Sequence, residues 1–399
     1  MNRRLFLQTS AAASLGMAAL PVSFKPANRA WADELNQHTI KEITFSEISL
    51  KWPRQVGKNA RLDVHGHGPS ARICQLTTDQ GASGWGHAPY ANSEIAALKA
   101  RLLNQRVGDC LSVEQGILNE SLRVFDLPLH DLAGIILNKP VYQLLGAKAP
   151  FLTKCYSGMI YFDELEPENQ SKGLDTILEE CQWDYDYGYR QFKLKIGRGQ
   201  QWMPQQKGLQ RDIEVTRLVA EHFPDCDILV DANDGYSVAG FIQYLEGVQG
   251  IPLFWVEEPF PETRANCAKL KEWMQANGFE STYLADGEFE PDIPFVKSLA
   301  REQLIDVCLF DIVGYGFTPW RKLMPELQST QTLASPHAWG TLLKSYYIAH
   351  LAGGLGNTCT VEGATCLSDQ IDFGDYQMKD GQLIPSPQPG FGMTLHLNK

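Results

Sequence analysis

A regular alternation of short apolar stretches with helical stretches, from about residue 151 to residue 363, constrains the fold more than any other feature of this chain. Each apolar stretch has the length of a buried parallel strand, and most are followed by a segment long enough for a helix. The candidate strands begin near Phe151, Arg190, Asp227, Pro252, Thr282, Ile305, Thr332 and Thr358. Eight strands of this kind predict a parallel (β/α) barrel, whose strand ends meet at one mouth.

Carboxylates stand at or just after the ends of three of these strands. Asp231, Glu257 and Glu288 are spaced 26 and 31 residues apart, each about one strand plus one helix. An isolated buried carboxylate is costly, so each needs a cation or a partner. One such acid also suits a helix N-cap or half of a salt bridge, but three in succession predict oxygens that converge on a hard divalent cation. We expect one Mg²⁺ per site, with Mn²⁺ as the alternative ion.

Two lysines lie on the second candidate strand. In the stretch 191–195, the strand period of two places Lys193 and Lys195 on one face and Phe192 and Leu194 on the other. The apolar pair is expected to pack on the helices, so both lysines point into the barrel, where one ammonium disfavours protonation of the other and makes it a usable base. The alternative is a salt-bridge core in which both lysines pair with Asp231 and its neighbours.

Three further groups fall at the ends of the last strands. Asp311 ends the sixth, His337 the seventh and Glu362 the eighth. A lone histidine is often structural, but active sites of barrels lie at these strand ends. A carboxylate bonded to one ring nitrogen fixes the tautomer and orients the other nitrogen as a base.

The residues before the barrel, from about Thr39 to Lys148, predict an α+β unit. Strands are expected over 39–50 and 70–78, a turn at 84–86, and helices over 93–106, 112–120 and 129–137. After Asp369 the chain is not helical, and Asp380-Gly381 predicts a hairpin within 376–384. We expect this tail to fold back on the first unit.

Charge and cysteine content restrict the partners. The formal net charge of −12 argues against nucleic acid and against anionic membrane surfaces, so an anionic substrate requires a local positive site. No internal run of about 18 apolar residues suggests a membrane span. The nine cysteines are an odd number without a Cys-x-x-Cys pair, which argues against a disulfide framework. Cys359 and Cys366 are the one close pair that leaves a bridge open.

The first 32 residues resemble a twin-arginine export signal. Arg3 and Arg4 precede a weakly apolar, alanine-rich stretch, and Ala30-Trp31-Ala32 offers small residues at a cleavage site, so the mature chain starts at Asp33. With no cysteine near that point, we expect no lipid or membrane anchor after processing and a periplasmic or otherwise exported protein. The alternative is a basic, disordered N-terminus.

Taken together, the motifs resemble the mandelate racemase/muconate lactonising enzyme family, in the mandelate racemase subgroup of the enolase superfamily. The stretches 130–134 and 139–146 are similar to the end of that family's capping domain. The resemblance implies a (β/α)7β, TIM-like barrel over 151–368, an N-terminal α+β capping domain over 33–150, and a tail over 369–399 that completes the capping domain.

The resemblance also implies roles for individual residues. It makes Lys195 a base, Lys193 the contact for the substrate carboxylate, Asp311 and His337 a His–Asp dyad, and Glu362 an electrophilic acid. Asp231, Glu257 and Glu288 fall on its magnesium ligands, and Asn233 matches a polar residue beside them.

The chain departs from the family pattern in three places. The family's Gly-Gly after the dyad aspartate is absent, so Tyr315 is expected to enter the pocket. The segment 197–208 resembles an insertion that reshapes the mouth or an interface. The capping loop, 51–70, is polar and basic and contains Arg54, Lys58, Arg61, His65 and His67. We expect Arg54, His65 and His67 to contact substrate; the alternative is a plain solvated loop.

These groups share one chemistry, the removal of a proton next to a carboxylate. Three outcomes stay open: dehydration of an acid sugar to a 2-keto-3-deoxy acid, racemisation or epimerisation of a 2-hydroxy or sugar acid, and a non-catalytic binder of acid sugars. We expect the first, because a basic capping loop suits hydroxyl groups. The expected partners are a small acid substrate and further copies of this chain in a homo-oligomer.

The export signal can be tested directly. Replacing Arg3 and Arg4 by lysine is expected to leave full-length precursor in the cytoplasm, since lysine does not reproduce the twin-arginine motif. Cell fractionation and N-terminal sequencing of exported wild-type protein should give Asp33 as the first residue. Wild-type protein that stays cytoplasmic and unprocessed would contradict the assignment.

Overall fold

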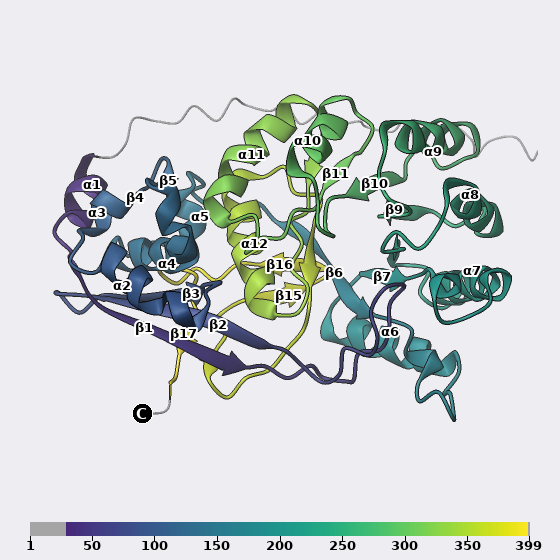
Figure 1. Ribbon diagram of the computed structural model, residues 1–399, viewed down its shortest axis with the longest axis horizontal. Helices are drawn as coiled ribbons and strands as arrows, with labels where there is room; N and C mark the ends of the chain where they lie inside the picture. The colour runs from purple at the N-terminus through teal and green to yellow at the C-terminus, as the bar shows by residue number, and fades with distance from the viewer. Residues whose placement is uncertain (1–28, 398–399) are drawn as a thin grey trace, which may run out of the picture.

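The computed structural model describes residues 29–397. The expected export signal lies outside the described residues up to position 28, and helix α1 (Arg29–Leu35) spans the expected cleavage point. Within 29–397, no helix has both the length and the hydropathy needed to cross a bilayer. Figure 1 shows two parts, an α+β unit that carries α1 to α5 and a barrel that carries α6 to α12.

An antiparallel sheet forms one layer of the α+β unit. Its strands β1 (Ile40–Ser49), β2 (Ser70–Thr78) and β3 (Ser83–His87) lie in that order. The predicted turn at 84–86 is wrong, because these residues form β3. A Cβ atom on Gly84 would stand 2.3 Å from the backbone nitrogen of Leu132, so this glycine allows helix α4 (Asp126–Ile136) to approach the sheet closely.

The helices of this unit differ from those that the sequence suggests: the one expected over 93–106 ends at Leu102, and the one expected over 129–137 is α4, which begins earlier, at Asp126. The predicted helix over 112–120 is wrong: β4 (Leu111–Ser112) and β5 (Gly116–Ile117) form a small hairpin there. Gly116 turns the chain at φ +77°, a value that a helix does not contain. The remaining elements are η1 (Asn92–Glu94), α2 (Ile95–Leu102), α3 (Val107–Cys110), η2 (Glu120–Phe125) and α5 (Val141–Leu144).

The barrel contains the eight predicted strands, all parallel to one another. They are β6 (Thr153–Ile160), β7 (Gln191–Lys195), β8 (Asp227–Asp231), β9 (Leu253–Glu257), β10 (Tyr283–Asp286), β11 (Val307–Cys308), β12 (Leu333–Ala334) and β13 (Thr360–Gly363). Neighbours in sequence pair with each other, and β13 pairs with β6. A parallel bridge between Ala334 and Thr358 joins the last two strands, so the sheet closes on itself. The (β/α)7β prediction is confirmed.

Seven helices connect these strands and cover the outside of the barrel (Figure 1). They are α6 (Asp175–Tyr187), α7 (Gln205–His222), α8 (Val238–Gly247), α9 (Arg264–Ala276), α10 (Ile293–Arg301), α11 (Phe317–Ser329) and α12 (Leu342–Leu355). Two 3-10 turns, η3 (Asp163–Leu165) and η4 (Arg198–Gln200), follow β6 and β7 at the mouth. Phe192 and Leu194 of β7 are fully buried in the apolar layer between strands and helices, as the strand period predicts.

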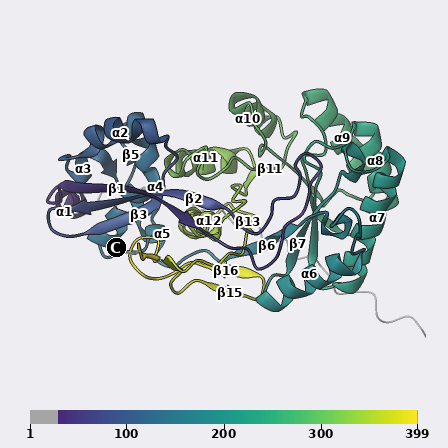
Figure 2. The same cartoon turned by 60° about the horizontal axis from the view of Figure 1, so that its bottom comes forward.

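The tail contacts both parts of the molecule, and Figure 2 shows β15 and β16 alongside β6. The predicted hairpin is confirmed as β15 (Gln377–Lys379) and β16 (Gln382–Ile384), and β16 pairs antiparallel with the start of β6. Farther on, two hydrogen bonds join the tail to the α+β unit. The Phe391 amide of the tail donates to Asp131, and the indole of Trp85 donates to the Met393 carbonyl of the tail. Two short strands, β14 (Ile371–Asp372) and β17 (Thr394–Leu395), pair with each other.

The nine cysteines are all free thiols. Cys359 and Cys366, the close pair in sequence, make separate contacts: the first thiol donates to the Ala334 carbonyl, and the second accepts from the Leu342 amide. The bridge that their spacing left open is absent.

Candidate active site at the barrel mouth

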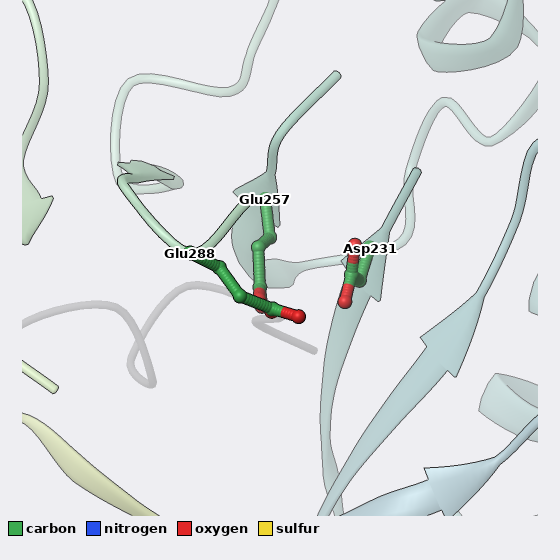
Figure 3. Close-up of side chains that lie close together, drawn as sticks. All are labelled: Asp231, Glu257 and Glu288. Atoms are coloured by element: carbon green, nitrogen blue, oxygen red, sulfur yellow. The ribbon is translucent and has the colours of Figure 1, made fainter. Parts of the chain in front are cut away.

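The three predicted acids converge at the carboxyl ends of neighbouring strands. Strand register pairs Lys195 with Asp231 and Asp231 with Glu257, so one row of residues crosses β7, β8 and β9. Glu288 follows β10 by two residues and turns toward the same point, as Figure 3 shows. One potential ligand atom from each of the three carboxylates lies within 4.8 Å of those of the other two. The barrel therefore produces the cluster that the sequence predicts.

Both lysines of β7 reach these acids. Lys193 Nζ lies 2.9 Å from Glu257 Oε1, 3.1 Å from Asp231 Oδ2 and 3.2 Å from Glu362 Oε1. Lys195 Nζ donates to Asp231 Oδ2. These ion pairs are also those of the salt-bridge alternative, so the contacts alone do not distinguish a catalytic site from a charged core.

Unpaired oxygens distinguish the two readings. Glu257 Oε2 and Glu288 Oε2 are buried without a hydrogen-bond partner, and so is the side-chain oxygen of Asn233. The backbone amide of Asn233 donates to Asp231. A closed salt-bridge core would satisfy its buried oxygens, because leaving them unpaired is costly. Hard oxygen donors with free lone pairs fit a divalent cation held by Asp231, Glu257 and Glu288.

Burial raises the pKa of both Glu257 and Glu288, and the neighbouring charges decide whether each pKa ends above or below its ordinary value. Burial and the neighbouring Asp231 raise the pKa of Glu257 well above its ordinary value. Burial would also raise the pKa of Glu288, but His337 and the two lysines outweigh it and hold that pKa well below the ordinary value. Burial lowers the pKa of Lys193, yet Glu257 and Glu362 outweigh it, so Lys193 stays an ammonium. The neighbouring cations therefore favour the charged form of Glu288, whereas burial and Asp231 disfavour the charged form of Glu257.

Lys195 differs from the expectation of a depressed pKa. Burial lowers its pKa, but Asp231 outweighs both burial and the charge of Lys193, and the pKa is raised. A divalent cation held by Asp231 would attract the same carboxylate oxygens as Lys195. It would therefore weaken the ion pair between Lys195 and Asp231. Lys195 as a free base therefore depends on the cation.

His337 stands on the Glu288 side of the acids. Its Nδ1 lies 3.1 Å from Asp311 Oδ2, and its Nε2 lies 3.2 Å from Glu288 Oε1. Burial lowers the pKa of His337, but Glu288, Glu362 and Asp311 outweigh it and raise the pKa to about 10. The Asp311 contact directs Nδ1–H away from the site and leaves Nε2 toward it, as a His–Asp dyad requires.

Glu362 and a residue that the sequence did not single out complete this side. Glu362 Oε2 accepts from the Ala338 amide at 2.7 Å, while its other oxygen contacts Lys193. Lys344 on α12 donates to Asp311 Oδ2 at 2.7 Å, the oxygen that also contacts His337. No motif marks Lys344, which lies in the first turn of α12.

The basic groups of the capping loop are mostly engaged elsewhere. Arg54 binds Asp184 of α6 through two nitrogens, at 2.8 and 3.0 Å. Lys58 lies 2.9 Å from Glu166 and 2.6 Å from Glu168. The Arg61 guanidinium pairs with Asp234 and donates to the Asn233 carbonyl. These cations anchor the loop to the barrel and do not extend toward the three acids, contrary to the prediction for Arg54.

The histidines of the loop have different places. His65 Nδ1 donates to the Gly57 carbonyl, 2.7 Å away, and the His65 ring lies 4.8 Å from the ring of Tyr161. Burial, followed by the charge of Lys195, lowers the pKa of His65, so this ring borders the site in its neutral form. The side chain of His67 is exposed, and only its carbonyl is engaged, by the Trp52 amide.

The ring of Tyr315 does not point toward Asp231, Glu257 and Glu288. Its ring packs 4.9 Å from Phe310 and 5.6 Å from Trp320, on the side of the barrel where α11 begins. Its backbone amide donates to the Asp311 carbonyl, so the segment that replaces the family's Gly-Gly is anchored through the backbone. The ring fills an aromatic cluster instead of the expected place in the pocket.

The segment 197–208 clamps the capping loop. Gln201 donates to the carbonyls of Ala60 and Arg61, at 2.8 and 2.9 Å, and the Trp202 indole donates to the Asn59 carbonyl at 2.6 Å. Of the two roles that the sequence left open, these contacts are those of a segment that shapes the mouth.

A buried ion network fixes the start of that segment. Arg198 is fully buried, pairs with Glu164 and Asp212, and donates to the carbonyl of Lys195 at 3.2 Å. Asp212 also accepts from the Gly197 amide at 2.8 Å. The network holds the backbone that follows Lys195, and no local pattern revealed it, because Glu164 comes from η3 and Asp212 from α7.

The family model described as "Enolase C-terminal domain-like" matches residues 176–399. D-xylonate dehydratase of Haloferax volcanii is 21% identical over 402 residues, which cover 92% of this chain and 94% of that protein. D-galactarolactone cycloisomerase of Agrobacterium fabrum is 24% identical over 76% of this chain and 71% of that protein.

Solved structures agree with these relatives. Galacturonate dehydratase from Geobacillus sp., in complex with D-galacturonate and 5-keto-4-deoxy-D-galacturonate, is 30% identical with a TM-score of 0.83, over 90% of this chain and 95% of that one. A mandelate racemase/muconate lactonizing protein from Geobacillus sp. Y412MC10, in complex with magnesium and tartrate, is 29% identical with a TM-score of 0.84, over 90% and 93%.

The fold and the acids at its mouth define an enzyme of the enolase superfamily. Within that superfamily, the chain belongs to the mandelate racemase/muconate lactonising enzyme family, as the sequence motifs predict.

The metal assignment makes a direct prediction. Asp231→Asn, Glu257→Gln and Glu288→Gln are each expected to weaken Mg²⁺ binding and to lower turnover by about a thousandfold, since a bound cation contributes several kcal/mol to charge stabilisation. Isothermal titration with Mg²⁺ measures the first effect without any substrate. Glu221→Gln, an exposed change on α7, is the matched control. Full activity of chelator-treated protein would refute the assignment.

Proposed function

We propose that this enzyme removes the α-proton of an acid sugar and expels its β-hydroxyl, which gives a 2-keto-3-deoxy acid. One observation carries the proposal: two proton-transfer groups, Lys195 of β7 and His337 after β12, contact opposite members of one acid cluster, Asp231 and Glu288. A bound Mg²⁺ would supply the Lewis acid that makes a proton next to a carboxylate removable.

The remaining steps belong to the residues of this chain. Lys193, an ammonium surrounded by carboxylates, stabilises the negative charge that develops on the substrate carboxylate. Lys195 takes the α-proton. His337, held as a donor by Asp311, gives a proton to the departing β-hydroxyl. The α-hydrogen leaves as a proton and the hydroxyl leaves as water, so the reaction needs no oxidant or reductant.

One solved relative supports this choice. A compound bound to the Geobacillus galacturonate dehydratase is a 5-keto-4-deoxy uronate, which is a 2-keto-3-deoxy acid when numbered from its carboxylate. Epimerisation uses the same first step and returns the proton on the other face, so it stays the second candidate. A non-catalytic binder would have no need of both Lys195 and His337.

We also propose that the enzyme acts after export and as a homo-oligomer. The twin-arginine motif supports export. Nine free thiols are consistent with folding in a reducing compartment before transport.

The two-base arrangement can be tested by exchange in D₂O. Lys195→Ala and His337→Asn are each expected to lower turnover by about 10²–10⁴-fold, the usual contribution of a general acid or base. Each variant should retain α-proton exchange on the face of the surviving base, observed by NMR. Lys207→Ala and His222→Asn, both exposed on α7, are the matched controls. Turnover at the wild-type rate in both Lys195→Ala and His337→Asn would show that these two residues are not the proton-transfer groups.

The reaction itself is decided by product analysis. Mg²⁺-loaded protein incubated with aldonic, aldaric and uronic acids is expected to form a 2-keto-3-deoxy acid, detected as the semicarbazone and by mass loss of one water. An α-inverted acid without loss of water would establish the epimerase, and no turnover across the panel would favour the binder.

A further inference from the structure

Four aromatic side chains from three distant segments meet beside the proton-transfer groups. Trp52 and His65 come from the capping loop, Tyr161 follows β6, and Trp339 stands two residues after His337. The Trp339 ring lies 5.3 Å from that of Trp52, 4.9 Å from that of Tyr161 and 5.8 Å from that of His65. We call these four rings the aromatic wall.

The wall borders the site directly. Lys195 Nζ lies 5.3 Å from the centroid of the Tyr161 ring. Trp52 and Tyr161 are buried, whereas His65 and Trp339 are partly exposed. The wall therefore presents two rings, and the other two support them. The Trp52 indole also donates to the Gly340 carbonyl at 3.0 Å, which fixes the backbone next to Trp339.

The loop thus contributes rings, and not cations, to the site. Arg54, Lys58 and Arg61 are held by acids of the barrel, and the pKa of His65 is lowered, by burial and then by Lys195. The Gly57 carbonyl occupies Nδ1 of His65 as the donor nitrogen, which leaves Nε2 as a hydrogen-bond acceptor. A ligand at this surface meets aromatic faces with one acceptor between them.

We propose that the wall selects the ring form of the substrate, so that the acid sugar is a uronic acid bound as a pyranose with its C–H face against Trp339. A pyranose has one largely apolar face and a polar rim, which matches aromatic rings beside the acceptor of His65. An open-chain aldonic or aldaric acid carries hydroxyls on all sides and would leave several of them unpaired against the wall. This inference rests on the proposed function and names its substrate class. Loss of the α-proton and of the β-hydroxyl as water would leave an unsaturated pyranose, and opening of its hemiacetal followed by tautomerisation would give the 2-keto-3-deoxy acid.

Binding of matched acids tests the inference without turnover. D-galacturonate and D-glucuronate are the ring-form probes, and D-galactonate and D-gluconate are the open-chain probes, each titrated into Mg²⁺-loaded protein by calorimetry. We expect Kd values at least about tenfold lower for the uronates, the size of one good aromatic contact. Saturation-transfer NMR on the wild type should show the ring C–H protons of the uronate close to aromatic protons.

Variants of Trp339 separate stacking from folding. Trp339→Leu should raise the Kd and KM of uronates about tenfold, with kcat changed less than about threefold, while Trp339→Phe should retain most of the affinity. Trp273→Leu on α9, where a partly buried tryptophan stacks 6.0 Å from Phe279, is the matched control and should change neither constant. A purely structural role of Trp339 would lower kcat and the thermal midpoint together.

The outcomes distinguish this inference from the proposed function. Aldonates that bind as tightly as uronates, with Trp339→Leu unchanged in affinity, would overturn the ring-form inference even if the enzyme dehydrates them. Preferential binding of mandelate would overturn it in favour of an aromatic acid. Tight, Trp339-dependent binding of uronates without turnover would support the subsite and reject the dehydratase.

Discussion

The mutual neutralisation of buried charges at the barrel mouth is the constraint on which the rest of this structure depends. Asp231, Glu257 and Glu362 are almost fully buried, and each contacts the ammonium of Lys193. Isolated carboxylates are not stable in such a place, and removing one partner of a buried pair leaves the other uncompensated. The cluster persists because the barrel brings strand residues 169 positions apart, from Lys193 to Glu362, to one point.

The backbone around this cluster is held as firmly as the side chains. Arg198 ties the carbonyl of Lys195 to two acids, and Asp311 accepts from the amides of Val313 and Gly314 as well as from His337. Proton transfer needs donor and acceptor within hydrogen-bond reach, so fixed backbone on both sides keeps the two bases at a constant separation. A cation can then redistribute charge among the acids without moving the groups that transfer protons.

The sequence predicts those parts of the fold and the site that depend on local pattern and on strand direction. Strands that end in acids, and alternation at 191–195, suffice to place Asp231, Glu257 and Lys193 together. Partners from distant loops are not visible in this way. From the sequence, Arg54 is an unpaired cation and Lys344 an ordinary helical lysine. Only the structure shows that Arg54 pairs with Asp184 of α6 and that Lys344 pairs with Asp311. The wrong helix at 112–120 has a local cause, the positive φ of Gly116.

The anchoring of the capping loop changes what that loop says about substrate. A basic loop predicts attraction of hydroxyl groups and anions. A cation that is already paired with a carboxylate of the protein, however, attracts a ligand only weakly. The same segment places the ring of His65 at the site, next to the ring of Trp339 from the barrel. The proposed function therefore assigns recognition of charge to Lys193 inside the barrel, and the ring-form inference assigns recognition of shape to His65 of the loop together with Trp339 of the barrel. Because Lys193 lies on another segment, a change of ring in the loop would leave it in place.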